Sequence, residues 1–198
     1  FGMNKEILED LLLFYSSNDL KLVSLKEYVS RMKDDQNHIY YASGDSLDKI
    51  SKSPQTQLLK DKGYEILYLN DEVDEFAVKV LADYDGKTFM SVSDSDLEID
   101  EDEKEKREEI KKDNKELFDK MKEYLSDDII DVEPSNRLKD SPVCLISKGE
   151  ISIEMEKVLS QMPESGGVMA EKVLEINTNH KVFDKIKEAF DKEDFEKV

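Results

Sequence analysis

Apolar residues in the first part of the chain alternate between two spacings, one typical of helices and one typical of strands. Runs with apolar residues three and four positions apart predict helices. Two runs rich in aromatic and β-branched residues predict strands at His38–Ser43 and Tyr64–Leu69. The second run is nearly continuous in apolar residues, as expected of a strand covered on both faces. The predicted helices occupy residues 4–14, 24–32, 46–53, 56–62 and 73–82. This alternation predicts an α/β unit over residues 1–95, a small sheet with helices packed on it.

Local signals mark the ends of several of these helices. Ser24 and Glu27 have the Ser-x-x-Glu spacing of a capping box, which makes Ser24 an N-cap. Gly63 follows the fourth helix, where a glycine commonly ends one. A turn is expected at Tyr84–Lys87, because Asp-Gly lies at its centre.

The composition changes at residue 94, where a run of almost entirely charged side chains begins and continues to Lys112. Acidic residues dominate its first half, which suits the positive end of a helix dipole. A sparse apolar stripe follows at Ile110, Leu117, Met121 and Leu125. We therefore expect a long, partly solvated helix from Asp96 to Leu125 that connects two units.

Strand-like segments return after this helix. They lie at 129–134, 142–147 and 173–177, and a last helix carries Phe183, Ile186 and Phe190. Residues 96–198 are therefore predicted to form a small mixed-sheet domain with packed helices, of the α+β type. The whole chain is assigned to the α/β class: a small three-layer α/β subdomain, a long charged connecting helix and the mixed-sheet domain. The helical spacing continues to Val198, which points to a fragment of a longer protein.

One amphipathic stretch, Glu150–Gly167, permits two interpretations. One helical face of this stretch carries the apolar residues Ile151, Met155, Val158, Leu159 and Met162. On the pattern alone, such a face is more often part of a core. The alternative is an adaptable binding surface, which methionine suits because its side chain is flexible. A second candidate surface is Glu75 and Phe76 with Lys79 one turn on, although Phe76 is equally suited to a core.

Charge excludes several classes of partner. The 198 residues include 29 basic and 48 acidic ones, giving a net charge of −19. Such a charge repels nucleic acid and anionic membrane surfaces. A single cysteine, Cys144, precludes an intramolecular disulfide and fits a reducing, cytoplasmic compartment. The sequence shows no signal peptide and no apolar run near the roughly 20 residues that a membrane span needs.

Tests for catalytic, metal and cofactor sites in the sequence give no candidate. His38 and His180 are far apart, and Cys144 alone cannot complete a zinc site. Asp94, Asp96 and Asp100 lack the glycine of a calcium-binding EF-hand loop. The glycines at 166 and 167 are not followed by the Lys-Ser/Thr of a phosphate loop. An enzyme with an unrecognised pair of acids is the least favoured interpretation.

Several strings in this sequence resemble the heat shock protein 90 family, in its bacterial type. They are IYYASG, SPQ, GYEILYL, DEVDEF, YDGK, SPVCL and LEINTNH, and the resemblance covers nearly the whole chain in order. The family is an ATP-driven, dimeric chaperone of three domains. The resemblance places residues 1–95 in the distal part of the middle domain and residues 96–198 in the C-terminal domain. It finds no counterpart of the nucleotide-binding domain or of the last, dimerising helices.

The resemblance implies a molecular chaperone that binds non-native client proteins, in which this fragment supplies client-binding and domain-coupling surfaces. ATP and magnesium belong to the full-length protein, so this chain is expected to hydrolyse no ATP, hold no cofactor and be a monomer or weak dimer. The resemblance places client contacts at Ile151, Met155, Val158 and Leu159, to which Met162 of the same stripe is added, and at Glu75, Phe76 and Lys79. The alternative is a scaffold or dimerisation module that buries the amphipathic helix in its own core.

Overall fold

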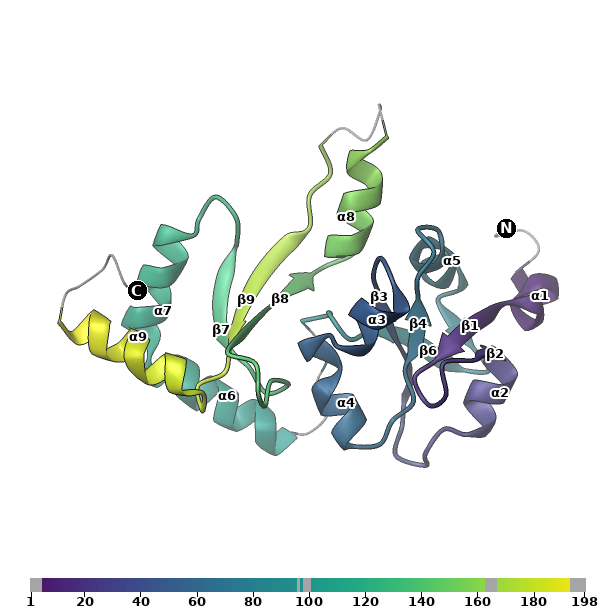
Figure 1. The fold of residues 1–198 in the computed structure, drawn as a ribbon, viewed down its shortest axis with the longest axis horizontal. Helices are drawn as coiled ribbons and strands as arrows, with labels where there is room; N and C mark the ends of the chain where they lie inside the picture. The colour runs from purple at the N-terminus through teal and green to yellow at the C-terminus, as the bar shows by residue number, and fades with distance from the viewer. Residues whose placement is uncertain (1–4, 96, 98–100, 163–166, 193–198) are drawn as a thin grey trace. The chain divides into compact units, whose positions relative to one another are not determined.

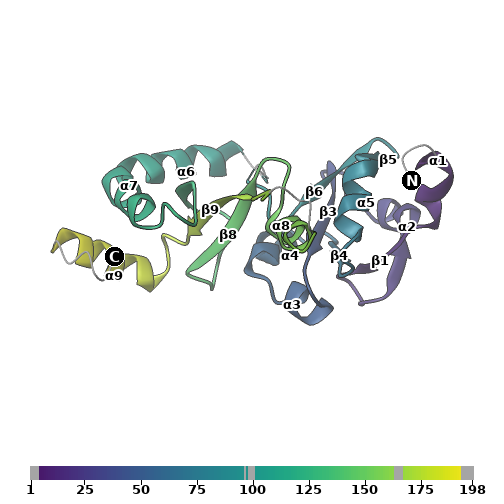
Figure 2. The same cartoon turned by 90° about the horizontal axis from the view of Figure 1, so that it is seen from above.

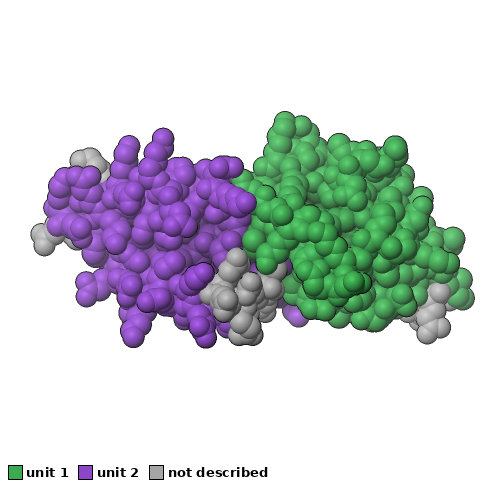
Figure 3. Space-filling view, turned by 90° about the horizontal axis from the view of Figure 1, so that it is seen from below, with its two compact units in different colours: residues 1–92, 154–168 green, residues 93–153, 169–198 purple. Residues whose placement is uncertain are grey.

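The chain forms two compact units in a computed structural model that describes residues 5–95, 97, 101–162 and 167–192. The first unit comprises residues 1–92 and 154–168, and the second comprises residues 93–153 and 169–198 (Figure 3). The first division between the units falls between residues 92 and 93. Residues 154–168 follow a strand of the second unit in sequence, yet they cluster with the first unit.

A six-stranded sheet forms the centre of the first unit, in the order β2-β1-β4-β3-β6-β5 (Figure 1). The neighbours β4, β3 and β6 are parallel, and the outer pairings are antiparallel. The strands are β1 (Leu13–Ser16), β2 (Leu22–Ser24), β3 (His38–Ser43), β4 (Leu67–Leu69), β5 (Asp83–Tyr84) and β6 (Lys87–Ser91). The helices are α1 (Lys5–Leu8), the 3-10 helix η2 (Glu9–Leu11), α2 (Leu25–Ser30), α3 (Leu47–Ser51), the 3-10 helix η3 (Pro54–Thr56), α4 (Gln57–Asp61), α5 (Asp74–Leu81) and α8 (Ile153–Ser160).

Helices cover both faces of this sheet, as the three-layer prediction requires. Helices α2 and α5 lie on one side and α3 and α4 on the other, and the two views agree (Figures 1 and 2). Successive side chains of a strand point to opposite faces, so Ile39 and Tyr41 of β3 join the core under α2 and α5. Tyr40 and Ala42 are equally buried and point the other way. Strand β3 is therefore apolar on both faces, which explains the unbroken IYYA run.

The capping box at Ser24 is confirmed. The Ser24 Oγ accepts from the Glu27 amide at 3.2 Å, and the Glu27 carboxylate accepts from the Ser24 amide at 2.8 Å. The strand prediction for His38–Ser43 is confirmed to the residue. The strand predicted at Tyr64–Leu69 is shorter, because only Leu67–Leu69 pairs as a strand.

The prediction of a helix over residues 4–14 is wrong at its end. Helical structure stops at Leu11, and Leu13–Ser16 is a strand. Phe14 is buried in the core opposite Val23 of β2. The four consecutive apolar residues from Leu11 to Phe14 satisfy either period, so pairing with β2 and β4 decides the outcome.

The second unit is built on a three-stranded sheet in the order β7-β9-β8, in which β9 is parallel to β7 and antiparallel to β8. Its elements are α6 (Glu101–Asp113), α7 (Lys115–Tyr124), β7 (Asp131–Pro134), β8 (Val143–Lys148), β9 (Glu171–Ile176) and α9 (Lys181–Asp191). The apolar core joins α7, α9 and one sheet face through residues such as Phe118, Val132, Ile176 and Phe183. The predicted helical continuation to Val198 lies outside the described residues.

The single connecting helix expected from Asp96 to Leu125 is two helices, and both belong to the second unit. They meet at Asn114, whose backbone angles (φ −114°, ψ 23°) leave the helical range. The Asn114 side-chain amide donates to the Ile110 carbonyl at 2.8 Å, the kind of local hydrogen bond that competes with a regular helix. The residues at 96 and 98–100, where the helix was expected to begin, lie outside the described part of the chain.

Ion pairs cover the other face of the second sheet. Lys111 of α6 reaches Asp131 at 3.0 Å and Glu133 at 2.9 Å, and Arg107 also pairs with Glu133. Deeper in the unit, Arg137 Nε lies 2.9 Å from Glu175 Oε2, and both side chains are fully buried. The charged face of α6 therefore packs partly against the three-stranded sheet and is only partly exposed to solvent.

Candidate functional site

A pocket of about 240 Å³ lies in the first unit, and three segments of the chain line it. These segments are the end of β3 with the loop after it, the stretch from the end of β4 into α5, and one face of α8. The lining residues are Ser43, Gly44, Asp45, Leu69, Asn70, Asp71, Glu72, Glu75, Glu154, Met155, Lys157, Val158 and Gln161. All of them belong to the first unit.

The pocket lies at the carboxyl ends of two parallel strands. Ser43 and Leu69, the last residues of β3 and β4, are paired in register. The Gly44 amide donates to the Leu69 carbonyl at 3.1 Å and so continues the pairing one step past β3. The chain then leaves β3 toward α3 on one face and leaves β4 toward α5 on the other. This divergence opens a crevice, the usual location of binding sites in open α/β sheets.

Glu75, in the first turn of α5, forms a buried acidic part of the pocket lining. It is 4% exposed, and its carboxylate accepts from the Tyr41 hydroxyl at 3.4 Å. The N-terminus of a helix stabilises negative charge there. Next to it, burial raises the pKa of Asp74, although Asp74 accepts a hydrogen bond from the Asp71 amide at 3.3 Å. Two acids are thus held together at the start of α5.

Helix α8 contributes both apolar and charged groups. Met155 is 7% exposed and Val158 is half-buried, and both line the pocket. Lys157 pairs with Glu154 at 2.6 Å. A hydrogen bond from Lys49, at 2.5 Å, and then the charge of Lys157 lower the pKa of Asp45. The charge of Lys157 thus acts on the loop after β3 as well as on α8.

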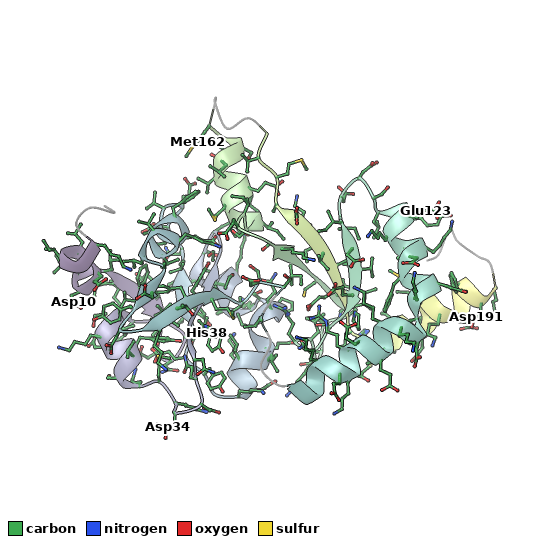
Figure 4. The ribbon with its side chains drawn as sticks, turned by 180° about the vertical axis from the view of Figure 1, so that it is seen from behind. Asp10, Asp34, His38, Glu123, Met162 and Asp191 are labelled. Carbon is green, nitrogen blue, oxygen red and sulfur yellow. The ribbon has the colours of Figure 1, made fainter. Side chains whose placement is uncertain are left out.

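The structure brings together only some of the residues that the sequence singled out. Glu75, Met155 and Val158 all line the same pocket, although Glu75 and Met155 are far apart in sequence. The others lie outside the lining: Ile151, Phe76 and Leu159 are half-buried, and Lys79 and Met162 are exposed. Met162 is 51% exposed and lies just beyond the end of α8 (Figure 4). Along the apolar stripe, therefore, Met155 is buried, Ile151, Val158 and Leu159 are half-buried, and Met162 is exposed.

Sequence reasoning missed the loop residues that complete the pocket, Gly44, Asp45 and Asn70–Glu72. The available signal was topological. Both stretches directly follow strands of the predicted α/β unit, and in a parallel pair the carboxyl ends of neighbouring strands lie at one edge.

Other chemically active groups give no second site among the described residues. No group of three or more His, Cys, Asp or Glu side chains there is placed to hold a metal ion. Burial, followed by the negative charge of Glu175, raises the pKa of Cys144 to about 12, which keeps the thiol protonated. The described helices include none that is long and apolar enough to cross a membrane.

Comparison with known proteins gives a consistent result. The family model described as Hsp90 protein matches residues 2–198. The chain is 59% identical over 198 residues to a protein named chaperone protein HtpG from Clostridium acetobutylicum, and covers 31% of that protein. It is 57% identical over 194 residues, or 98% of the chain, to the protein of the same name from Natranaerobius thermophilus, again 31% of the relative. A third relative of that name, from Alkaliphilus metalliredigens, is 60% identical over 192 residues, 96% of the chain and 31% of the relative. The chain therefore spans about a third of the length of these relatives.

Proposed function

Because the chain belongs to the Hsp90 family, we propose that it is the client-binding part of a molecular chaperone. The contact surface is proposed to be the pocket together with its rim, the exposed side chains of Val73 and Met162. One observation supports this proposal most. Two stretches that the family resemblance associates independently with clients, one around Glu75 and one around Met155, line the same pocket. Their separation in sequence makes this convergence a property of the fold.

The rim has the physical character that such a surface needs. Val73 is 69% exposed and lies next to the lining residue Glu72, and Met162 is 51% exposed next to Gln161. Exposed apolar side chains can bind non-native chains, and methionine adapts its shape to different partners. The surplus of acidic residues keeps a protein with such a surface soluble. Met155, being buried, contributes as a wall of the pocket.

In the full-length chaperone, ATP and magnesium would be held by segments outside this chain, and two subunits would associate. The 198 residues are proposed to bind clients without hydrolysing nucleotide. The proposal places the protein in the cytoplasm, where reducing conditions suit a chain with one cysteine.

One observation favours a second function, that of a scaffold module. The burial of Met155 is what a scaffold module would show if α8 served only to complete the core of the first unit. The two functions differ in what they require of the exposed rim, since a scaffold does not need Met162.

Met162→Ser tests the proposal, with Leu22→Ser as a matched control. Leu22 lies on the edge strand β2, is 50% exposed and does not line the pocket. The assay is suppression of light scattering when denatured citrate synthase is diluted out of guanidinium. We expect Met162→Ser to weaken suppression and Leu22→Ser to leave it unchanged, with both variants melting as the parent does. Equal effects of the two substitutions, or no effect of Met162→Ser, would contradict the proposal.

A further inference from the structure

We propose that the pocket at the ends of β3 and β4 binds a lysine or arginine side chain of the client, so that the chaperone prefers apolar segments that carry basic residues. The inference rests on the proposed function and adds the chemical class of the bound segment. Three features of the pocket support it: its charge, its apolar walls and its size.

Negative charge dominates the lining. Among the lining residues that the structure describes, five are acids, namely Asp45, Asp71, Glu72, Glu75 and Glu154, and Lys157 is the one base. Asp45 and Glu154 already pair with lysines, at 2.5 and 2.6 Å. Asp71 and Glu72 are exposed at the mouth, and Glu75 lies deeper. A cation that entered would meet opposite charge at the mouth and again inside.

The walls suit the stem of a long basic side chain. Leu69, Met155 and Val158 give the pocket an apolar side, against which the methylene groups of lysine or arginine can pack while the charged end meets carboxylates. Ser43 adds a hydroxyl Oγ that is buried and has no hydrogen-bond partner within the described part of the chain. That oxygen can accept a hydrogen bond from an ammonium or guanidinium group.

The size and place of the pocket favour a single side chain. Its volume of about 240 Å³ is below the roughly 300 Å³ at which pockets for drug-sized ligands begin. The crevice at the carboxyl ends of parallel strands is a binding location for reasons of topology, independent of its charge. Val73 and Met162 are exposed and next in sequence to the lining residues Glu72 and Gln161, so they can hold the apolar neighbours of the bound residue.

Fluorescence anisotropy with two labelled, disordered peptides tests the inference. The peptides share their length and apolar positions, and carry either lysine or glutamine at the remaining positions. For the unmodified 198-residue chain we expect the lysine peptide to bind roughly fivefold tighter, as two partly exposed ion pairs would give, with the preference falling as salt is added. The double variant Asp71→Asn, Glu72→Gln should lose most of this preference.

A matched control separates the pocket from the overall charge. Asp127→Asn, Asp128→Asn changes the net charge by the same amount at two exposed positions of the second unit. It should keep the preference for lysine. An equal loss in both double variants, or no preference in the parent chain, would overturn the inference.

The outcomes also separate this inference from the proposed function. If both peptides bind equally and Met162→Ser weakens the binding of both, the proposed client surface is supported and the preference for basic residues is contradicted. If neither peptide binds, the proposed function itself is contradicted.

Discussion

The two methionines of the α8 segment give a direct test of how the structure divides the apolar stripe. Met155 is 7% exposed and Met162 is 51% exposed, so the same substitution to alanine removes a buried side chain in one case and a half-exposed one in the other. Removing a buried methionine costs about 2–5 kcal/mol, and a value of about 2–3 kcal/mol is expected here because Met155 borders a pocket. Met162→Ala should change the free energy of unfolding by less than about 0.5 kcal/mol.

Tyrosine fluorescence during urea unfolding and during heating is a suitable assay. The chain has no tryptophan, and every tyrosine except Tyr124 lies in the first unit, so the signal reports the unit that contains α8. At about 2–4 °C per kcal/mol for a chain of this size, Met155→Ala should lower the melting temperature by roughly 4–12 °C. Nearly equal effects of the two substitutions would refute the division of the stripe. A negligible effect of Met155→Ala would show that α8 does not pack on the first unit.

Three further predictions concern side chains outside the pocket. Cys144 should react with iodoacetamide far more slowly in the native protein at pH 8 than in urea, because burial and then Glu175 raise its pKa to about 12; equal rates would contradict this. Arg137→Met should destabilise the second unit by up to about 3–5 kcal/mol, because it removes the buried cation 2.9 Å from Glu175 and leaves that carboxylate with the longer Arg107 contact at 3.6 Å. Arg137→Met with Glu175→Leu should recover much of that loss in urea unfolding. Burial and, to a smaller extent, the charge of Lys87 lower the pKa of His38 in the folded state. The unfolded state therefore binds the proton more readily, so the free energy of unfolding falls as the pH drops through the ordinary histidine range. The fall in melting temperature between pH 7.5 and 5.5 should therefore be smaller for His38→Gln than for the parent, and equal falls would exclude this role.

Much of the fold could be predicted because local and tertiary preferences agree. At Ser24 the capping box has both of its reciprocal hydrogen bonds, and His38–Ser43 is a strand whose residues are apolar on both faces. Where the two preferences compete, the sequence is ambiguous. Leu11–Phe14 fits a helix by spacing, yet Phe14 pairs with Val23 across two strands, which no local pattern reveals. Asn114 divides the charged segment into two helices through its non-helical backbone angles, and no local pattern in the sequence marks this position.

The candidate site was predictable only in part, for a related reason. The spacing of Met155 and Val158 identified an apolar face, but spacing does not determine what covers it. Its partners at the ends of β3 and β4 are brought there by strand order, and strand order is set by pairings between distant segments. Asp71 and Glu72 are therefore ordinary acids in a highly acidic sequence until the topology places them at the mouth of a pocket.

Hydrogen exchange of the chain with and without an unfolded client protein shows whether the pocket and its rim form the client-binding surface. Client binding should slow exchange at residues 69–76 and 154–162, which include the pocket lining and its rim, with little change in α7 and β8. Protection confined to the second unit's sheet and α7, or no protection at 69–76 and 154–162 while the client is bound, would contradict this prediction.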